Sequence, residues 1–442
     1  MHVVGIDIGT SSICGVIHDI SSDFIRSVTI RNDTAVISEN SDEKMQNPER
    51  ILDIVIVILN DLIGEKDDIV SIGITGQMHG ILYTDREGDA VSPLYTWQDG
   101  RGNRMMDNGE SYACYLSRFT SEPLATGYGL VTHFYNLKNH LVPAGACRLC
   151  TIMDYVVMKL TGLKHPVTEY SNAAPLGFFD KRELRFNYEE LLSVGIDGTF
   201  LPEAVTASLP LGFYNGAAVY PAIGDNQAAF LGSVVNLSEA VHITVGTSSQ
   251  ISIYTPEYIA IPQFDTRPLP GGGYILVGAE LCGGYALTLL KNFFAEAVKA
   301  ITGETVDDDT VYTAMMRMDI RHEVPLKVDT HFDGTRADPT RRGSISDIST
   351  FNFIPGNLVD AFLTGLSDAL HAYYLHLPLS LSETKTHIVA SGNGMRKNHR
   401  LREAFAKGFR LPVVMSEAVE EAAFGAAVYA GKCFVTVRND NL

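Results

Sequence analysis

A tetrapeptide that occurs twice constrains the fold of this chain more than any other feature of its sequence. Gly-Thr-Ser-Ser stands at residues 9–12 and again at 246–249. Apolar runs precede both copies, with VGIDI at 4–8 and VHITV at 241–245. Each copy therefore predicts a strand, a tight turn and a second strand. Since 442 residues suffice for two or three domains, we interpret the repeat as two related domains, 1–236 and 237–442. Two unrelated hairpins are the alternative.

The predicted turns have the chemistry of a phosphate site. Successive backbone N–H groups after a glycine form a concave anion site, and threonine and serine hydroxyls add donors. Two residues before the glycine, Asp7 stands in the first copy and Thr244 in the second. A carboxylate beside a phosphate repels it unless a cation lies between them, and Mg²⁺ is the natural mediator. We expect the two turns to hold a polyphosphate from both sides of a cleft, with ordinary turn chemistry as the alternative.

Charge and composition narrow the classes of partner. Lys and Arg total 34 against 52 Asp and Glu, so the net charge of −18 argues against nucleic acid. The first residues lack a signal-peptide pattern and no apolar run is long enough to span a bilayer, so we expect a cytoplasmic protein that binds no membrane. The six cysteines are too sparse for a disulfide scaffold. We interpret them as buried thiols, with metal or redox chemistry at Cys147 and Cys150 as the alternative.

The remaining patterns alternate strands with helices, which indicates an α/β fold. Apolar spacing predicts helices, one of which places Ala286, Leu290, Phe293, Ala297 and Ile301 on one face. The predicted helices span 47–62, 154–160, 281–301, 358–377 and 420–430, and buried strands span 69–75 and 387–390. A loop is predicted at 77–80, and the strand at 387–390 leads into the segment Ser-Gly-Asn-Gly at 391–394.

Six short segments, spread over nearly the whole chain, resemble those of the FGGY-type carbohydrate kinases, a family within the actin/Hsp70/hexokinase-like ATPases. They occur in the order of the family, at 5–12, 76–80, 96–101, 224–227, 246–248, and 392–394 together with 420–426. The resemblance implies two related ribonuclease-H-like domains around a central cleft, which binds ATP and Mg²⁺.

The resemblance implies that Asp225 is the catalytic base. In this family the aspartate of the Gly-Asp motif accepts the proton of the sugar hydroxyl that attacks the γ-phosphate of ATP. Asp7 would be the carboxylate on the Mg²⁺ side. The structural alternative for Asp225 is the N-cap of a helix that begins at Asn226.

The resemblance also implies ligands for the nucleotide and the sugar. Phosphate contacts would come from Thr10, Ser11, Ser12, Thr247 and Ser248. The nucleotide would approach Gly283, Gly284, Gly392, Asn393 and Asn398, where turns or helix caps are the alternative. The sugar pocket would comprise Gln77, Met78, His79, Trp97, Asp99, Arg101 and Asn172. Structural alternatives are a core aromatic for Trp97, a core histidine for His79, and a surface ion pair for Asp99 with Arg101.

The implied function is ATP-dependent phosphorylation of a terminal hydroxyl of a ketose. Segments at 96–101, 125–129, 154–157 and 171–174 are most similar to those of sedoheptulokinases, so sedoheptulose is the expected sugar. Xylulokinases are the alternative within the family, and a homodimer is expected from the resemblance.

One departure from the family pattern leaves a different class of function open. Family members often carry Lys or Arg shortly after the first phosphate turn, where this chain has Cys14. An inactive sugar-binding regulator is therefore an alternative, and a chaperone-like ATPase is another that the shared fold allows.

Overall fold

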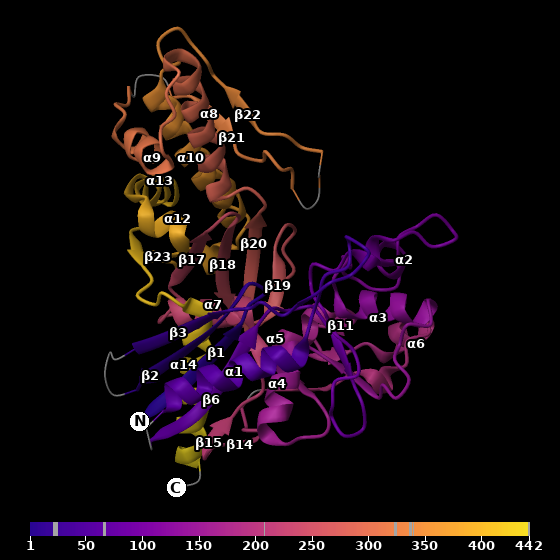
Figure 1. Cartoon of the computed structure of the whole chain (residues 1–442). Coiled ribbons are helices and arrows are strands. Elements are labelled where there is room, and N and C mark those ends of the chain that lie inside the picture. The colour runs from indigo at the N-terminus through magenta and orange to yellow at the C-terminus, as the bar shows by residue number, and fades with distance from the viewer. Residues whose placement is uncertain are drawn as a thin grey trace. The chain divides into compact units, whose positions relative to one another are not determined.

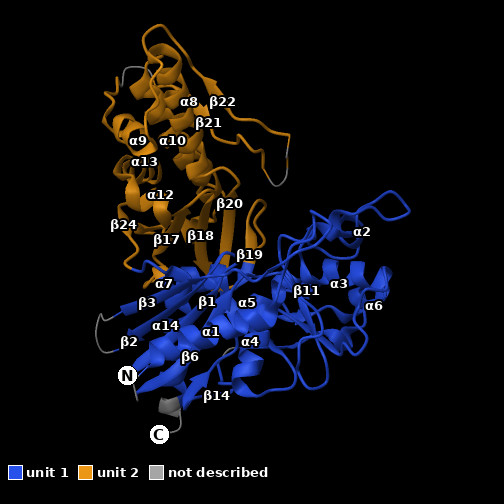
Figure 2. Ribbon diagram, in the orientation of Figure 1, with its two compact units in different colours: residues 1–232, 267–273, 418–442 blue, residues 233–266, 274–417 orange. Residues whose placement is uncertain are grey.

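The chain divides into two compact units (Figure 2). The structure is a computed structural model that describes residues 1–20, 25–64, 68–206, 208–321, 325–335, 338 and 340–440, with only the backbone at 438–440. Unit 1 comprises residues 1–232, 267–273 and 418–442, and unit 2 comprises residues 233–266 and 274–417. Each unit combines segments that are separate in the sequence, so the units do not test the single boundary predicted between residues 236 and 237, which stays a prediction. Within the described ranges, no helix has the length and apolar character needed to cross a bilayer.

Unit 1 is built on a mixed sheet in the strand order β14-β15-β6-β1-β2-β3 (Figure 1). Strand β1 pairs antiparallel with β2 and parallel with β6, and β2 pairs antiparallel with β3. The strands are β1 (His2–Ile8), β2 (Ser12–Asp19), β3 (Ile25–Arg31), β6 (Ile69–Gly76), β14 (Gly212–Tyr214) and β15 (Ala217–Val219), with β16 (Ile223–Gly224) also beside β6. The first Gly-Thr-Ser-Ser copy thus lies between two antiparallel strands, as predicted.

Unit 2 contains a sheet with the same sequence of strand directions. Strand β17 pairs antiparallel with β18 and parallel with β23, β18 pairs antiparallel with β20, and β23 pairs parallel with β24. The strands are β17 (Ala240–Val245), β18 (Ser249–Thr255), β20 (Tyr274–Glu280), β23 (His387–Ser391) and β24 (Val413–Met415), with β19 (Asp265–Pro268), whose last two residues belong to unit 1, at the edge. The second copy also joins antiparallel strands, which supports the interpretation of the repeat as two related folds.

Two helices cover opposite faces of the unit 1 sheet. Helix α1 (Pro48–Ile63) begins after Asn47, whose side chain accepts hydrogen bonds from the backbone of Glu49 and Arg50, both at 3.0 Å. Its side chains Ile58 and Leu62 lie over Gly15 of β2, whereas the backbone of α14 (Glu421–Asp440) lies over Gly5 of β1. The predicted helix at 47–62 is therefore confirmed, and its apolar stripe is the face that packs on the sheet.

Other elements complete the units. In unit 1 the helices are α2 (Tyr112–Leu116), α3 (Gly129–Lys138), α4 (Ile152–Thr161), α5 (Tyr170–Ala173), α6 (Tyr188–Ser193) and α7 (Asp225–Ser233), the last of which runs one residue into unit 2. Unit 2 has α8 (Gly284–Thr302), α9 (Asp308–Arg317), α10 (Pro355–Tyr374), α11 (Leu379–Ser382), α12 (Gly392–Lys397) and α13 (His399–Phe409). Short strands are β4 (Ala35–Val36), β5 (Met45–Gln46), β7 (Leu82–Thr84), β8 (Leu94–Tyr95), β9 (Arg148–Cys150), β10 (Val167–Glu169), β11 (Phe179–Asp180), β12 (Arg185–Phe186), β13 (Glu203–Val205), β21 (Lys327–Asp329) and β22 (Ser344–Ser346).

The apolar face predicted for the helix at 281–301 is only half correct. Ala286 and Leu290 of α8 are buried, but Phe293 is 58% exposed and Ile301 is 84% exposed. The buried residues of α8 are Ala286, Leu287, Leu290 and Lys291, and the half-buried Phe294 and Ala295 also pack against the core. The face that packs on the core is therefore rotated from the predicted one, because Phe293 and Ile301 fit the apolar spacing but lie on the exposed side of the helix.

The cysteines are partly as expected. All six are free thiols, of which Cys14, Cys150 and Cys282 are buried and Cys114 is exposed. Cys147 is half-buried. The interpretation as buried thiols therefore holds for three of them.

Close backbone packing fixes α14 in unit 1. A Cβ atom added at Gly5 would overlap the carbonyl oxygen of Ala423, and one added at Gly73 of β6 would overlap that of Ala426. Gly425 in α14 meets α7 in the same way, because a Cβ there would overlap the carbonyl oxygen of Ala228. Glycine is required at these positions because another backbone occupies the space of the side chain.

Substitution of Gly425 by alanine tests this packing. We expect Gly425→Ala to cost about 1–3 kcal/mol, because a Cβ would lie 2.8 Å from the nitrogen of Gly232 as well as against Ala228. The matched control is Gly431→Ala on the same helix, where the nearest atom is a methyl of Val3 at 3.1 Å and alanine favours the helix. Urea unfolding should show a lower midpoint for Gly425→Ala alone. Equal midpoints for the two variants would contradict the packing.

Candidate active site

The first Gly-Thr-Ser-Ser turn is held in shape by a buried asparagine. Asn32 donates from its side-chain amide to the carbonyl oxygen of Gly9 at 2.8 Å, and its backbone N–H donates to the carbonyl oxygen of Ser11 at 2.9 Å. Asn32 thus satisfies two carbonyl oxygens of the turn, whose backbone N–H groups are the kind of donor that an anion would contact. Ser11 is exposed, and Thr10 and Ser12 are half-buried.

Residues predicted for the sugar and for the phosphates form one hydrogen-bond network. The indole N–H of Trp97 donates to the hydroxyl of Thr10 at 2.9 Å, and Thr10 lies 3.4 Å from the amide oxygen of Gln77. Gln77 donates in turn to the side-chain oxygen of Gln46 at 2.8 Å, and Gln46 donates to the carbonyl oxygen of Thr10 at 2.8 Å. Gln46 was not predicted, because it sits in the two-residue strand β5, which carries no motif. Trp97 is 46% exposed, so the core-aromatic alternative is wrong.

Asp225 stands at the first residue of α7, directly after β16. The carbonyl oxygen of Ile223 accepts a hydrogen bond from the hydroxyl of Thr75 at 2.8 Å, which ties this junction to the end of β6. A Cβ added at Gly224 would lie 2.8 Å from the sulfur of Met78, so the predicted sugar residue Met78 packs against the residue that precedes Asp225. The structure therefore brings the Gly76–Gly80 segment and the Gly-Asp motif together.

Three carboxylates gather at the ends of elements in unit 1. Asp7 lies near the end of β1, Asp225 begins α7, and Glu420 immediately precedes α14. Burial and the negative charges of Asp225 and Glu420 raise the pKa of Asp7 to about 7. Burial raises the pKa of Asp225 to about 6. Ionisation of either carboxyl therefore costs free energy, and a nearby cation would lower that cost.

Cys14 faces this acidic group rather than an open phosphate site. It pairs directly with Asp7 in the antiparallel ladder of β1 and β2, so their side chains lie on the same face. It is 4% exposed and packs with Val16 and Ala423. Burial raises the pKa of the Cys14 thiol well above its usual range, so it is neutral and supplies no charge to oppose Asp7.

The donor chemistry fits Mg²⁺ that arrives with nucleotide phosphates. Within the described ranges, no three His, Cys, Asp or Glu side chains converge closely enough to hold an ion by themselves. Mg²⁺ usually keeps several waters and takes one or two carboxylates together with phosphate oxygens. Asp7 can supply such a carboxylate, because a cation would stabilise its negative charge beside Asp225 and Glu420. Asp7 would hold the ion, which would neutralise phosphate charge there.

Arg267 is a functional candidate that sequence reasoning missed. It belongs to the segment 267–273 of unit 1, which Gln227 of α7 ties down by donating to the carbonyl oxygen of Pro268 at 3.1 Å. Its positive charge lowers the pKa of Asp225 against the larger effect of burial. No motif marks this arginine, and only the fold brings it to the start of α7.

The second Gly-Thr-Ser-Ser turn, in unit 2, is surrounded by the predicted nucleotide glycines. The N–H of Gly283 donates to the carbonyl oxygen of Thr247 at 2.8 Å, and that of Gly284 donates to the carbonyl oxygen of Gly246 at 2.8 Å. Gly392 has φ of +82° and leaves no room for a Cβ beside the carbonyl oxygen of Val245. Thr247 and Ser248 are exposed at the tip of the turn. The structure thus brings 246–248, 283–284 and 392–394 together within one unit.

The two predicted asparagines of unit 2 differ in their surroundings. Asn393 is exposed in α12. Asn398 is the N-cap of α13, and its side-chain oxygen accepts a hydrogen bond from the N–H of Leu401 at 3.0 Å. The helix-cap alternative therefore describes Asn398 correctly, and its contact with the nucleotide stays a prediction.

Asp99 and Arg101 form a buried ion pair, so the surface alternative is wrong. Arg101 donates from Nε to Asp99 at 2.6 Å, and the two residues are 3% and 0% exposed. Asp99 also accepts from the N–H of Lys44 at 3.1 Å, and Arg101 donates to Asn136 at 2.9 Å. Their charged groups already have protein partners and hold the 96–101 loop in place.

The last two predicted sugar residues are also tied to the protein. His79 has φ of +73°, bonds the carbonyl oxygen of Pro175 through Nδ1 at 2.9 Å, and stacks on Tyr128 with ring centres 4.5 Å apart. Asn172 is fully buried and donates its amide to Thr151 and Asp154, both at 2.9 Å. Contact of either residue with the sugar stays a prediction.

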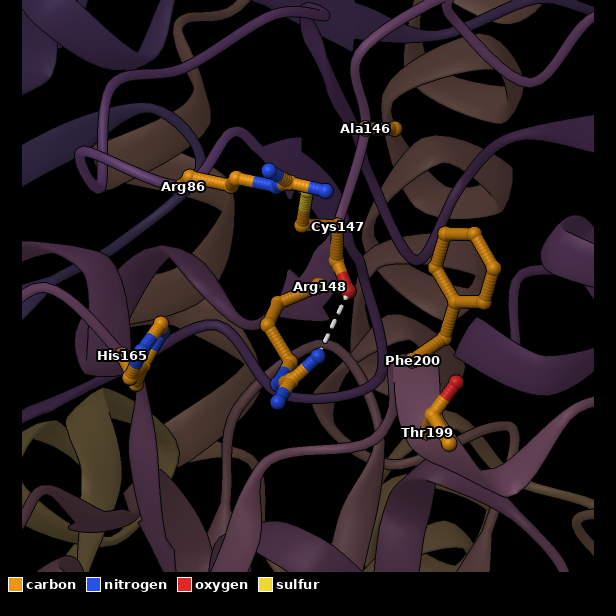
Figure 3. Close-up of a pocket in the computed structure, with 7 residues that line it drawn as sticks. All are labelled: Arg86, Ala146, Cys147, Arg148, His165, Thr199 and Phe200. Carbon is orange, nitrogen blue, oxygen red and sulfur yellow. Dashed lines mark hydrogen bonds between the residues drawn. The ribbon is translucent and has the colours of Figure 1, made fainter.

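A separate pocket of about 490 Å³ lies in unit 1, and none of the predicted site residues lines it (Figure 3). Arg148 points into it and donates to the carbonyl oxygen of Cys147 at 2.9 Å. Its lining consists of Arg86, Ala146, Cys147, Arg148, His165, Thr199 and Phe200. This pocket is therefore not the candidate active site.

Known proteins match the whole chain. Residues 2–232 match the N-terminal domain of the FGGY family of carbohydrate kinases, and residues 241–433 match its C-terminal domain. Sedoheptulokinase from Mus musculus is 28% identical, over 96% of this chain and 96% of that protein. Xylulose kinase from Staphylococcus xylosus is 24% identical, over 97% of this chain and 90% of that protein.

Solved structures agree on the fold. Xylulose kinase from Rhodospirillum rubrum superposes with a TM-score of 0.82 at 19% identity, covering 100% of this chain and 91% of that one. Glycerol kinase with ADP from Plasmodium falciparum has a TM-score of 0.79 at 18% identity, covering 99% of this chain and 92% of that one. The resemblance inferred from six segments is thus confirmed over both domains, and the chain belongs to the FGGY family of carbohydrate kinases.

Proposed function

We propose that this carbohydrate kinase transfers the γ-phosphate of ATP to the terminal hydroxyl of sedoheptulose, giving sedoheptulose 7-phosphate. The observation that carries the proposal is the hydrogen bond from Trp97 to Thr10, at 2.9 Å. It joins the loop predicted to contact the sugar to the turn predicted to contact the phosphates. Similarity to sedoheptulokinase over nearly the whole of both chains supports this substrate. Similarity to xylulose kinases makes a pentulose the alternative.

Asp225 is the proposed base. With a pKa of about 6 its carboxylate is mostly ionised at neutral pH, yet more basic than an ordinary aspartate. It would orient the attacking hydroxyl and accept its proton as the bond to phosphorus forms. The positive charge of Arg267 lowers this pKa and so favours the ionised carboxylate.

Thr10, Ser11 and Ser12 would bind phosphate oxygens from unit 1, and Thr247 and Ser248 would do so from unit 2. Gly283, Gly284 and Gly392 would let the nucleotide approach the backbone. The two turns are exposed or half-buried, as a phosphate contact requires. Mg²⁺ beside Asp7 would neutralise charge on the phosphates.

The other classes of function receive less support. A chaperone-like ATPase has no need for a loop such as 96–101, which contains the buried ion pair of Asp99 and Arg101. An inactive regulator would be expected to lose Asp7 or Asp225, and both are present. Cys14 remains the one feature that favours a regulator.

An assay of ADP release with Mg-ATP separates these functions. We expect turnover that depends on added sugar and is fastest with sedoheptulose among sedoheptulose, xylulose, ribulose and glycerol. Asp225→Asn removes the base and should lower kcat by about 100-fold or more. Asp107→Asn, which changes an exposed aspartate of unit 1, is the matched control and should keep full activity.

Each other outcome of this assay has a definite meaning. A preference for xylulose would keep the mechanism and reject sedoheptulose as the substrate. Turnover without sugar would favour the chaperone-like class. Binding of ATP with no turnover on any sugar would favour the regulator.

The pH dependence of kcat/KM tests the role of Arg267. Protonation of Asp225 removes the base, so activity should fall as the pH drops through about 6. Arg267→Met removes a charge that lowers this pKa, so the acidic limb should move to higher pH. Arg267→Lys keeps the charge and should leave the limb near that of the wild type. Asp7 titrates nearby and ATP also ionises, so the test compares the pH of the acidic limb between variants and does not use its absolute value. An identical limb in Arg267→Met would exclude the proposed role.

A further inference from the structure

A buried serine hydroxyl links a carboxylate to the backbone that precedes Asp225. The N–H of Gly224 donates to the hydroxyl oxygen of Ser171 at 3.0 Å, and the hydroxyl of Ser171 donates to Oε2 of Glu169 in a short hydrogen bond. The backbone N–H of Ser171 donates to the same oxygen at 2.7 Å. A serine hydroxyl has one hydrogen and two lone pairs, so its bond to Glu169 directs a lone pair at Gly224. Ser171 is 0% exposed and Glu169 is 3% exposed, so water does not compete for these groups.

The N–H of Gly224 lies one residue before Asp225, so its hydrogen bond to Ser171 can influence how Asp225 is oriented. It belongs to the peptide group between Ile223 and Gly224, whose carbonyl oxygen already accepts from Thr75 at 2.8 Å. With both ends of that peptide bonded to side chains, its plane is fixed one residue before Asp225 begins α7. No side chain at Gly224 can assist, because a Cβ there would lie 2.8 Å from the sulfur of Met78.

The buried carboxyl of Glu169 costs free energy of folding at this position. It forms no ion pair within the ranges that the structure describes, and burial raises the pKa of its carboxyl to about 7. The nearby carboxyl of Asp154 adds to that increase. A buried carboxyl without a cation destabilises a fold, and its hydrogen bonds offset only part of that cost. Capping the four-residue helix α5 uses only the bond from the N–H of Ser171, and leaves the bond to the hydroxyl unexplained.

We propose that Ser171 and Glu169 are positioning residues that aim the Asp225 carboxylate at the sugar hydroxyl. Neither residue touches a substrate; Glu169 orients the Ser171 hydroxyl, and that hydroxyl holds the Gly224 N–H. The inference rests on the proposed function, since it assigns this pair to the same base.

Removal of the Ser171 hydroxyl tests the proposal while it leaves the cap of α5 in place. We expect Ser171→Ala to lower kcat by about 10-fold to 100-fold, the scale of effect that a small misplacement of a catalytic group produces. The KM values for sugar and ATP should stay within about threefold of the wild type, because the binding residues are untouched. Ser171→Thr keeps the hydroxyl and should restore most of the activity.

A matched control and a second pair of variants guard against a general loss of structure. Ser367→Ala removes the hydroxyl of another buried serine, which donates to the carbonyl oxygen of Ala404 in unit 2, and should leave kcat unchanged. If Ser171→Ala does not fold, Glu169→Gln and Glu169→Leu make the same comparison. Glutamine keeps an acceptor oxygen and should retain activity within about threefold, whereas leucine should lose it.

Amide hydrogen exchange gives a readout that needs no turnover. Faster exchange of the peptide that contains Gly224 is expected in Ser171→Ala, with exchange restored in Ser171→Thr. A kcat within about twofold of the wild type, or unchanged exchange at Gly224, would overturn the positioning pair. Wild-type enzyme that showed no sugar-dependent ADP release would instead reject the function proposed for Asp225, whatever the exchange result.

Discussion

The close approach of the α14 backbone to its neighbours is the interaction on which the rest of unit 1 depends. Gly5 and Gly73 let α14 lie directly on the central strands, and Gly425 lets it cross α7 at Ala228. Those contacts bring together the end of β1, the start of α7 and the residue before α14. Asp7, Asp225 and Glu420 are close neighbours for that reason, although they are far apart in the sequence.

The electrostatics of the site follow from this packing. Carboxylates that are crowded and withdrawn from water resist ionisation, and the raised pKa values of Asp7 and Asp225 express that resistance. The positive charge of Arg267 stabilises the ionised form of Asp225, whereas the neutral thiol of Cys14 does not stabilise the ionised form of Asp7. A site of this kind is suited to a cation that enters with the nucleotide. At Cys14, the departure from the family pattern therefore leaves the charge of Asp7 without a cation at that position.

Much of this arrangement was predictable because it is encoded locally. The repeated turn, the capped helix after Asn47 and the strand before Gln77 each follow from a short pattern, and the structure confirms them. Proximity of Trp97 to Thr10 could be expected only from the family resemblance, since no spacing rule joins residues so far apart. Arg267, Gln46 and the bond from Gly224 to Ser171 could not be predicted, because each depends on the position of a segment with no motif of its own. The buried face of α8 was predicted incorrectly because the exposed Phe293 and Ile301 fit the apolar spacing as well as the buried residues do.

The central claim is transfer of phosphate to a sugar, and identification of the product tests it most directly. Phosphorus NMR of a reaction that contains enzyme, Mg-ATP and sedoheptulose would follow the γ-phosphate itself. The account predicts a new phosphomonoester resonance that is coupled to the protons on C7 and grows in step with ADP. Release of inorganic phosphate alone, with sedoheptulose unchanged, would contradict it.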